Sequence, residues 1–306
     1  MKLAIVGAGA MGSIFGARLT QAGNEVLLVD VSKELVEKIS ADGITIESKD
    51  GTETTVPVTA TTSPPAKPFD AVLFLVKCYH TESAIELATP LVGHKTVTAT
   101  LQNGWGNGGR LAARFGDERT VVGVTYNSGT GRGIGRAAHT GIGPSFIGPY
   151  AGVSTEHADP LGRALADAGF EVTVTGDVRT EVWKKLVLNC ATLPTSALTR
   201  LTAGALGESS VLEVAHALAR EATQVAQALG YEIAIDERLE TITANLRNGG
   251  SGKASMLQDV EAGRRTEIDV ISGAVVAAAT EHNVDVPLTT AVLNLVRGLE
   301  KGAGLK

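Results

Sequence analysis

The feature that most constrains the fold is a glycine motif close to the first residue. Gly7-Ala8-Gly9-Ala10-Met11-Gly12 follows a short apolar run, residues 2–7, and opens a segment whose apolar residues have helical spacing. A strand, a GxGxxG turn and a helix in this order bind a pyrophosphate at the free amides of the helix N-terminus. The first glycine allows the tight turn, the second lets the backbone approach the phosphates, and the third lets the helix pack on the strand. We therefore predict a Rossmann dinucleotide-binding unit in which these six residues contact the cofactor.

An acidic residue follows at the spacing that such a unit requires. Asp30 ends the second predicted strand, residues 25–30. A carboxylate at this position accepts hydrogen bonds from the adenosine ribose hydroxyls and repels a 2′-phosphate, so it favours NAD(H) over NADP(H). Lys33 lies three residues further on and would soften that repulsion. The alternative is that Asp30 only caps the helix that follows.

The apolar pattern divides the chain into two halves. The first half alternates strand-like and helix-like segments, as a parallel α/β sheet requires, with a polar hairpin at residues 44–60. The second half carries helical spacing throughout and few strand signals. Its predicted helical stretches are 178–206, 209–230, 235–246 and 256–282. We predict an α/β fold with a Rossmann NAD(P)-binding domain at residues 1–176 and an all-helical domain for substrate and catalysis at residues 177–306.

Composition excludes several function classes. The net charge of −6 and the 4% aromatic content argue against nucleic-acid binding, which needs a basic face and stacking platforms. No apolar run reaches the ~18 residues of a membrane span, and we recognise no signal peptide. Cys78, Cys190 and six scattered histidines show no metal-ligand spacing, so we expect no metal. The expected location is the cytoplasm, and the apolar surface of the helical half allows a homodimer.

Further blocks of sequence carry a more specific pattern. They are Phe74-Leu75-Val76-Lys77, Leu101-Gln102-Asn103-Gly104, Trp183-Lys184-Lys185-Leu186-Val187-Leu188-Asn189, and Ser255-Met256-Leu257-Gln258-Asp259 followed by Thr266-Glu267-Ile268-Asp269. In this order and spacing they resemble the ketopantoate reductase (2-dehydropantoate 2-reductase) family from residue 1 to about residue 298. The resemblance implies hydride transfer from NAD(P)H to the ketone of the small 2-keto acid 2-dehydropantoate, which gives (R)-pantoate for pantothenate biosynthesis.

The resemblance also implies roles for individual residues. Lys185 matches the catalytic lysine, Glu267 the functional glutamate, Asn189 and Ser255 substrate-binding residues, and Lys77 and Asn103 residues at the junction of cofactor and substrate. The chemistry agrees, because hydride addition builds negative charge on the carbonyl oxygen and requires a proton donor. A half-buried lysine has a lowered pKa and serves as that acid. Lys185 and Asn189 are four residues apart, so a helix projects both from one face.

Simpler interpretations exist for the same residues. Lys184 and Lys185 fit a solvated helix face, and Glu267 beside Arg264 and Arg265 fits a surface ion pair.

The other positions also have structural interpretations. Ser255 with Gln258 three residues later fits a capping box. Asn103 before Gly104 fits plain turn chemistry, and Lys77 fits a solvent-facing strand end.

Two departures from the family pattern define the main alternative. Many members carry a second asparagine where this chain has Leu193, and members that prefer NADPH tend to carry a basic residue where it has Asp30. Both favour an NAD-dependent D-2-hydroxy-acid dehydrogenase acting on branched or aromatic 2-keto acids. A more remote alternative is a non-catalytic dinucleotide-sensing module. That alternative predicts loss of the catalytic positions. All of these positions are retained, namely Lys185, Asn189, Ser255 and Glu267.

Overall fold

The structure, a computed structural model, describes residues 1–305, which divide into two compact units. The first comprises Met1–Gln102 and Asn107–Arg179. The second comprises Asn103–Gly106 and the chain from Thr180 onward. The sequence predicted a single division near residue 176 and did not anticipate that the short Asn103–Gly106 segment groups with the helices. Each unit is described by itself.

The first unit is built on a large twisted sheet. Within residues 1–305 its strands are β1 (Lys2–Val6), β2 (Glu25–Val29), β5 (Thr59–Thr61), β6 (Ala71–Phe74), β7 (Val97–Thr100), β8 (Thr120–Thr125), β11 (Ser145–Pro149) and β12 (Val172–Val174). Their order is β12-β11-β8-β7-β6-β1-β2-β5. All neighbours pair in parallel except β8 and β11. The predicted α/β fold with a parallel sheet is confirmed.

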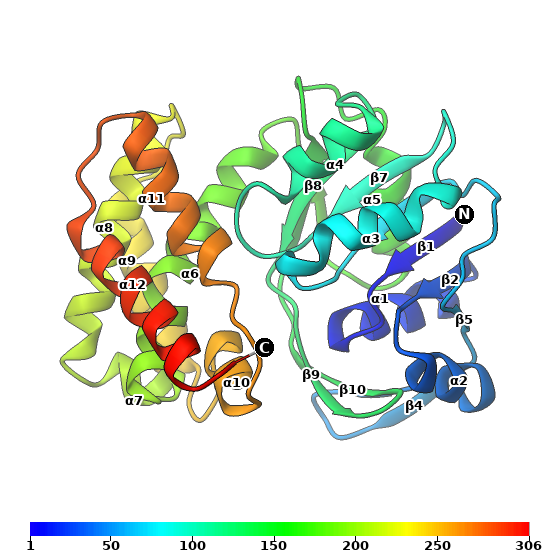
Figure 1. Cartoon of the computed structure of the whole chain (residues 1–306), viewed down its shortest axis with the longest axis horizontal. Helices are drawn as coiled ribbons and strands as arrows, with labels where there is room; N and C mark the ends of the chain where they lie inside the picture. The colour runs from blue at the N-terminus through cyan, green and yellow to red at the C-terminus, as the bar shows by residue number, and fades with distance from the viewer. Residues whose placement is uncertain (306) are drawn as a thin grey trace. The chain divides into compact units, whose positions relative to one another are not determined.

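Helices cover both faces of this sheet, as Figure 1 shows. They are α1 (Ala10–Gln21), α2 (Lys33–Asp42), α3 (Thr81–Ala88), α4 (Asn107–Phe115) and α5 (Asp159–Asp167), with 3-10 turns η1 (Cys78–His80) and η2 (Thr89–Leu91). Strand β1 alternates between the two resulting cores. Leu3 and Ile5 pack with α1 and α5, whereas Ala4 and Val6 pack with α3 and α4. A strand buried on both faces accounts for the unbroken apolar run at residues 2–7.

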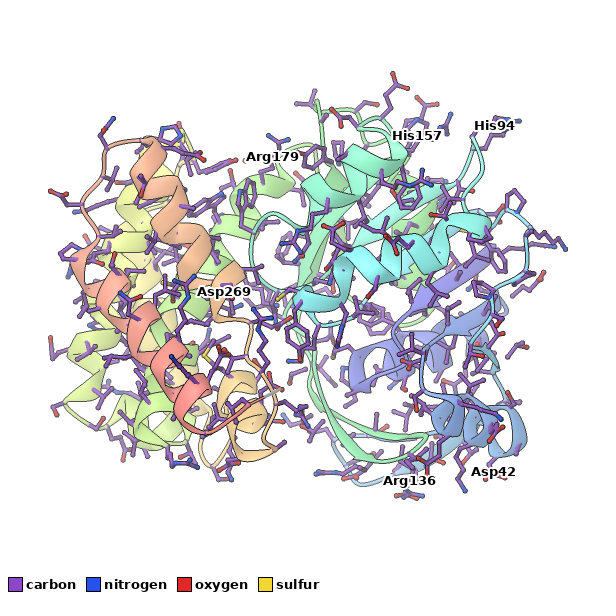
Figure 2. All side chains as sticks on the ribbon, in the orientation of Figure 1. Asp42, His94, Arg136, His157, Arg179 and Asp269 are labelled. Carbon is purple, nitrogen blue, oxygen red and sulfur yellow. The ribbon has the colours of Figure 1, made fainter. Side chains whose placement is uncertain are left out.

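A smaller sheet adjoins the N-terminal half of this unit. It has the order β4-β3-β10-β9, formed by β3 (Ile44–Glu47), β4 (Glu53–Val56), β9 (Ser128–Gly133) and β10 (Arg136–Gly141). The predicted hairpin is present as β3 and β4, and Gly51 in its turn has a φ of +85°. Arg136 on β10, labelled in Figure 2, forms an ion pair with Glu53 on β4.

The second unit is helical. Its elements are α6 (Val178–Thr199), α7 (Ala203–Gly207), α8 (Val211–Ala228), α9 (Ile235–Asn248), α10 (Ser255–Glu261), η3 (Ile268–Val270), α11 (Ser272–Glu281) and α12 (Pro287–Gly302). The continuous helix predicted for residues 256–282 is wrong, because α10 ends at Glu261 and α11 begins only at Ser272. Helix α12 was not predicted. Among the helices of residues 1–305, none combines the length and apolarity needed to cross a membrane.

Candidate active site

The glycine motif forms a tight turn between β1 and α1. Gly7 has a φ of +100°, and a Cβ there would lie 2.8 Å from Val76 Cγ1. A Cβ on Gly12 would lie 1.8 Å from the Gly7 carbonyl oxygen, so no other residue fits. Gly9 differs, because nothing lies within 4 Å of its Cβ position and it directly precedes the first residue of α1. The turn therefore leaves open space in front of a helix N-terminus, which suits a dinucleotide pyrophosphate.

Asp30 joins the end of β2 to this glycine turn. Its Oδ2 accepts a hydrogen bond of 2.8 Å from the Ala8 amide, and its Oδ1 accepts one of 2.9 Å from the Ser32 amide. The capping interpretation of Asp30 is wrong, because the N-cap of α2 is Ser32, whose hydroxyl accepts from the Leu35 amide. An ionised carboxylate has about four acceptor sites, so Asp30 retains capacity for ribose hydroxyls.

Lys77 follows the neighbouring strand. Strand β6 ends at Phe74 rather than at Lys77, and Lys77 precedes the 3-10 turn η1, where its carbonyl accepts from the His80 amide. The solvent-facing strand end proposed for Lys77 is therefore wrong, since the side chain is half-buried and outside the strand. Because Val76 contacts Gly7, the Lys77 backbone lies next to the glycine turn.

Sequence reasoning missed a buried glutamine that fixes this region. Gln102 Nε2 donates to the Val76 carbonyl at 2.8 Å and to Thr81 Oγ1 at 2.9 Å. Its Oε1 accepts from Thr100 Oγ1 at 2.9 Å. These bonds tie the segment after β6 to the end of β7. Gln102 belonged to a recognised sequence block, but the contacts that give it a role are long-range.

In the helical unit, three of the predicted residues lie together. Lys185 Nζ on α6 donates to Asn103 Oδ1 at 2.9 Å, and Asn103 Nδ2 donates to Glu267 Oε2 at 3.3 Å. Asn103 thus contacts an ammonium and a carboxylate with the two ends of one amide, and is more than a turn residue. The solvated-face interpretation of Lys185 is wrong, because its ammonium lies in this cluster. Lys184 pairs with Glu181 on the same helix at 2.8 Å.

Burial changes the acidity of Lys185. Removal of the ammonium from water lowers its pKa from the usual 10.5 to about 8, and the charge of Glu267 opposes that shift. A lysine with this pKa is protonated at neutral pH and readily gives up the proton. It therefore has the acidity of a general acid that works near neutral pH.

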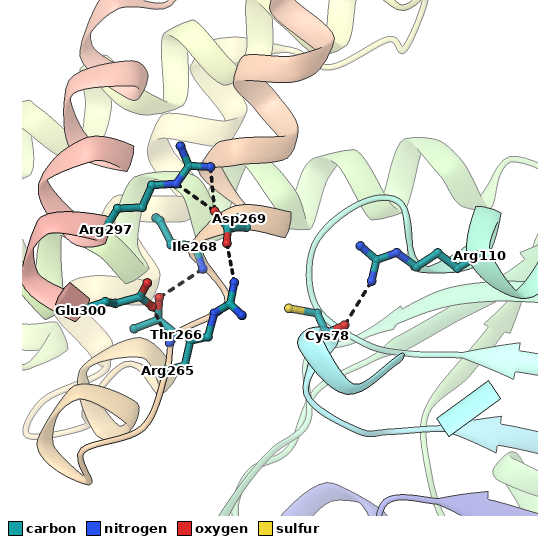
Figure 3. Close-up of polar contacts among 8 residues, drawn as sticks. All are labelled: Cys78, Arg110, Arg265, Thr266, Ile268, Asp269, Arg297 and Glu300. Atoms are coloured by element: carbon teal, nitrogen blue, oxygen red, sulfur yellow. Dashed lines mark hydrogen bonds and ion pairs between the residues drawn. The ribbon is translucent and has the colours of Figure 1, made fainter. Parts of the chain in front are cut away.

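Glu267 is buried and lies between α10 and α11, where a continuous helix was predicted. Its side chain is only 6% exposed, so the surface ion pair proposed from the sequence is wrong. The Thr266 amide donates to Glu300 on α12 at 2.7 Å (Figure 3). Asp269, the middle residue of η3, is held between Arg265 and Arg297 at 2.9 Å and 2.8 Å (Figure 3).

The remaining two predicted residues lie outside this hydrogen-bonded set. Asn189 is buried one helical turn after Lys185 on α6, so both project from the same face. Ser255 is the first residue of α10 and is half-buried. The capping-box interpretation of Ser255 is wrong, because the N-cap of α10 is Ala254 and Gln258 Nε2 donates to the Lys253 carbonyl.

Neither cysteine resembles a reactive thiol or a metal ligand. Cys190 is fully buried, and burial raises the pKa of its thiol to about 11. Cys78 is also buried. Over residues 1–305, no three His, Cys, Asp or Glu side chains lie close enough to hold a metal ion.

Both halves of the chain match one protein family. Residues 3–152 match the family described as ketopantoate reductase PanE/ApbA, and residues 177–300 match the C-terminal part of the same family. The chain belongs to the ketopantoate reductase family. A 2-dehydropantoate 2-reductase of Archaeoglobus fulgidus is 32% identical over 303 residues, covering 98% of both chains.

Solved structures of family members and relatives have the same fold. The ketopantoate reductase of Ralstonia eutropha JMP134 has a TM-score of 0.90 and 32% identity, covering 99% of this chain and 100% of its own. The ternary structure of D-mandelate dehydrogenase with NADH and anilino(oxo)acetate has a TM-score of 0.95 over 100% of both chains. Its 24% identity makes it a likeness of fold alone.

The position of Glu267 predicts how Lys185 titrates. We expect Glu267→Gln to lower the pKa of Lys185 further below about 8, because burial remains and the opposing negative charge is lost. The measurement is the rate of Lys185 acylation by acetic anhydride as a function of pH, read by mass spectrometry, with Lys184 in the same peptide as the internal reference. An unchanged or raised midpoint for Lys185 would show that Glu267 does not support its positive charge.

Proposed function

We propose that this protein is a 2-dehydropantoate 2-reductase, which uses a nicotinamide cofactor to reduce the ketone of 2-dehydropantoate to (R)-pantoate. The observation that carries the proposal is the hydrogen-bonded set of Lys185, Asn103 and Glu267 in a chain that matches this family along nearly its whole length. The matching curated relatives include 2-dehydropantoate 2-reductases that are about 30% identical over their full length.

The glycine turn is the proposed cofactor site. When bound, NAD(P)H supplies the hydride that reduces the ketone carbon. The open space before α1 and the free amides of its first turn would hold the pyrophosphate, and Asp30 would accept hydrogen bonds from the ribose hydroxyls. Lys77, next to Val76 and the glycine turn, is the proposed residue at the nicotinamide end.

Lys185 is the proposed proton donor. As the ketone carbon accepts a hydride, the carbonyl oxygen becomes an alkoxide and takes a proton from the Lys185 ammonium, which leaves a neutral amine. Asn103 Oδ1 fixes the position of Nζ, and the Glu267 charge favours the protonated form before the reaction. Asn189 and Ser255 are the proposed partners of the substrate's polar groups. Since the acid must start protonated, reduction slows as the pH rises through about 8.

The cofactor preference is a separate proposal. We propose that NAD(H) is preferred, because the carboxylate of Asp30 stands at the end of β2, where a 2′-phosphate would meet its charge. Lys33 pairs with Glu37 at 3.6 Å, so part of its charge is offset. A cytoplasmic location and a homodimer stay predictions.

Side-by-side kinetics test the proposed function. We expect kcat/KM with 2-dehydropantoate to exceed the values for 2-ketoisovalerate and benzoylformate, with NADH used better than NADPH. A higher value for either competitor would favour the D-2-hydroxy-acid dehydrogenase, and Leu193, buried on α6, is then the first residue to vary. Cofactor binding without reduction of any 2-keto acid would favour the sensing module.

Replacement of Lys185 tests the proton donor. We expect Lys185→Ala to lower kcat by ~100-fold or more and to leave NADH binding nearly unchanged, as loss of a general acid does. Lys184→Ala is the matched control, because it removes the adjacent lysine, which pairs with Glu181. Stopped-flow turnover and NADH titration measure the two properties. Turnover at the unmodified rate in Lys185→Ala would remove Lys185 from this role.

Replacement of Asp30 tests the cofactor preference. We expect Asp30→Ala to shift the NADH/NADPH ratio of kcat/KM toward NADPH by ~10-fold, because the repelling charge is gone. Ser32→Ala is the control, since it removes the cap of α2 and leaves that charge in place. If both variants change the ratio equally, the effect comes from the turn and not from the carboxylate.

A further inference from the structure

The segment Asn103–Gly106 is held by the helical unit through contacts that the proposed mechanism does not use. The Trp105 amide donates to the Val270 carbonyl at 2.9 Å. Gly104 has a φ of +85°, and a Cβ there would lie 2.4 Å from the same carbonyl oxygen. The backbone of the segment therefore lies directly against the turn η3.

The ring of Trp105 makes a second set of contacts. It lies 5.5 Å from the ring of Trp183 on α6 and 6.2 Å from the ring of Tyr231, and these two rings are stacked at 5.8 Å. These three residues are the only Phe, Trp or Tyr side chains in Asn103–Gly106 and residues 180–306. The large aromatic side chains of the helical unit are thus packed together around Trp105 of this short segment.

The aromatic cluster lies only a few residues along the chain from the hydrogen-bonded set of Lys185, Asn103 and Glu267. Asn103, which contacts Lys185 and Glu267, is two residues from Trp105. Trp183 is two residues before Lys185 on α6. Val270, which accepts from Trp105, itself donates its amide to the Glu267 carbonyl at 3.2 Å. Movement of Trp105 would therefore displace Asn103 relative to both of its partners.

We propose that Trp105 is a positioning residue, whose ring on Trp183 and Tyr231 holds the Asn103 amide between Lys185 and Glu267 for the reduction. This inference rests on the proposed function for its kinetic part. Gly106, with a φ of +100° and open space around its Cβ position, lets the chain turn out of the segment immediately afterwards. Trp105 acts through Asn103, which contacts Lys185 and Glu267.

A double-mutant cycle tests whether Trp105 acts through Asn103. We expect Trp105→Leu to lower kcat by ~10-fold, since small misplacements of reacting groups cost rates of this order. Trp105→Phe keeps a ring and should restore kcat to within ~3-fold of the unmodified enzyme. The double variant Trp105→Leu/Asn103→Ala should be no slower than Asn103→Ala alone. Losses that multiply in the double variant, or an unchanged kcat in Trp105→Leu, would overturn the proposal.

Loss of stability needs its own control. Leu293→Ala removes a buried side chain of α12 and should lower Tm while leaving kcat unchanged. If Trp105→Leu does not fold, Tyr231→Leu removes one of the two facing rings without altering the segment and should lower kcat in the same direction. A loss of kcat in Leu293→Ala equal to that in Trp105→Leu would mean that any destabilisation suffices, and it would contradict the proposal.

Hydrogen exchange separates this inference from the proposed function. Amides of residues 103–106 should exchange at least ~10-fold faster in Trp105→Leu than in the unmodified protein or in Leu293→Ala, because the Trp105 amide loses its fixed position against Val270. This result needs no substrate. Slow exchange in Trp105→Leu would contradict the positioning role of Trp105. An unmodified enzyme that reduces no 2-keto acid would contradict only the proposed reductase function.

Discussion

An ammonium group that is removed from water loses several kcal/mol of hydration free energy, and burial imposes this loss on Lys185. The shift of its pKa from 10.5 to about 8 corresponds to ~3 kcal/mol in favour of the neutral amine. The group remains usable as an acid because a carbonyl oxygen of Asn103 accepts from it and the Glu267 charge lies near it.

Glu267 reaches Asn103 from the segment between α10 and α11, where the predicted helix is interrupted. Residues 262–271 leave α-helical geometry, and contacts to α12 stabilise the interruption. Glu300 accepts from the Thr266 amide, and Arg297 pairs with Asp269. A continuous α-helix would satisfy the backbone hydrogen bonds equally well, but the helical repeat would then set the direction of the Glu267 carboxylate. The interrupted segment therefore carries the buried carboxylate of Glu267. Helix α12 supplies polar partners to this segment.

The sequence predicted the features that depend on local spacing. The glycine turn, the place of Asp30 after β2 and the shared face of Lys185 and Asn189 all follow from strand and helix periods. The contacts of Asn103 do not, because Lys185 is 82 residues away and Glu267 is 164 residues away along the chain. Apolar spacing also continues through the gap between α10 and α11, since Ile268 and Val270 of η3 are buried as helix residues would be. Only tertiary partners distinguish the two cases.

The aromatic composition of the helical unit has a practical consequence. The chain contains two tryptophans, and both belong to the aromatic cluster described above. Trp183 is fully buried and Trp105 is partly exposed. Fluorescence excited at the long wavelengths that only tryptophan absorbs therefore comes from this one location. The unmodified protein carries its own optical reporter of events around Lys185, and occupancy of the site is open to observation without a label or a coupled reaction.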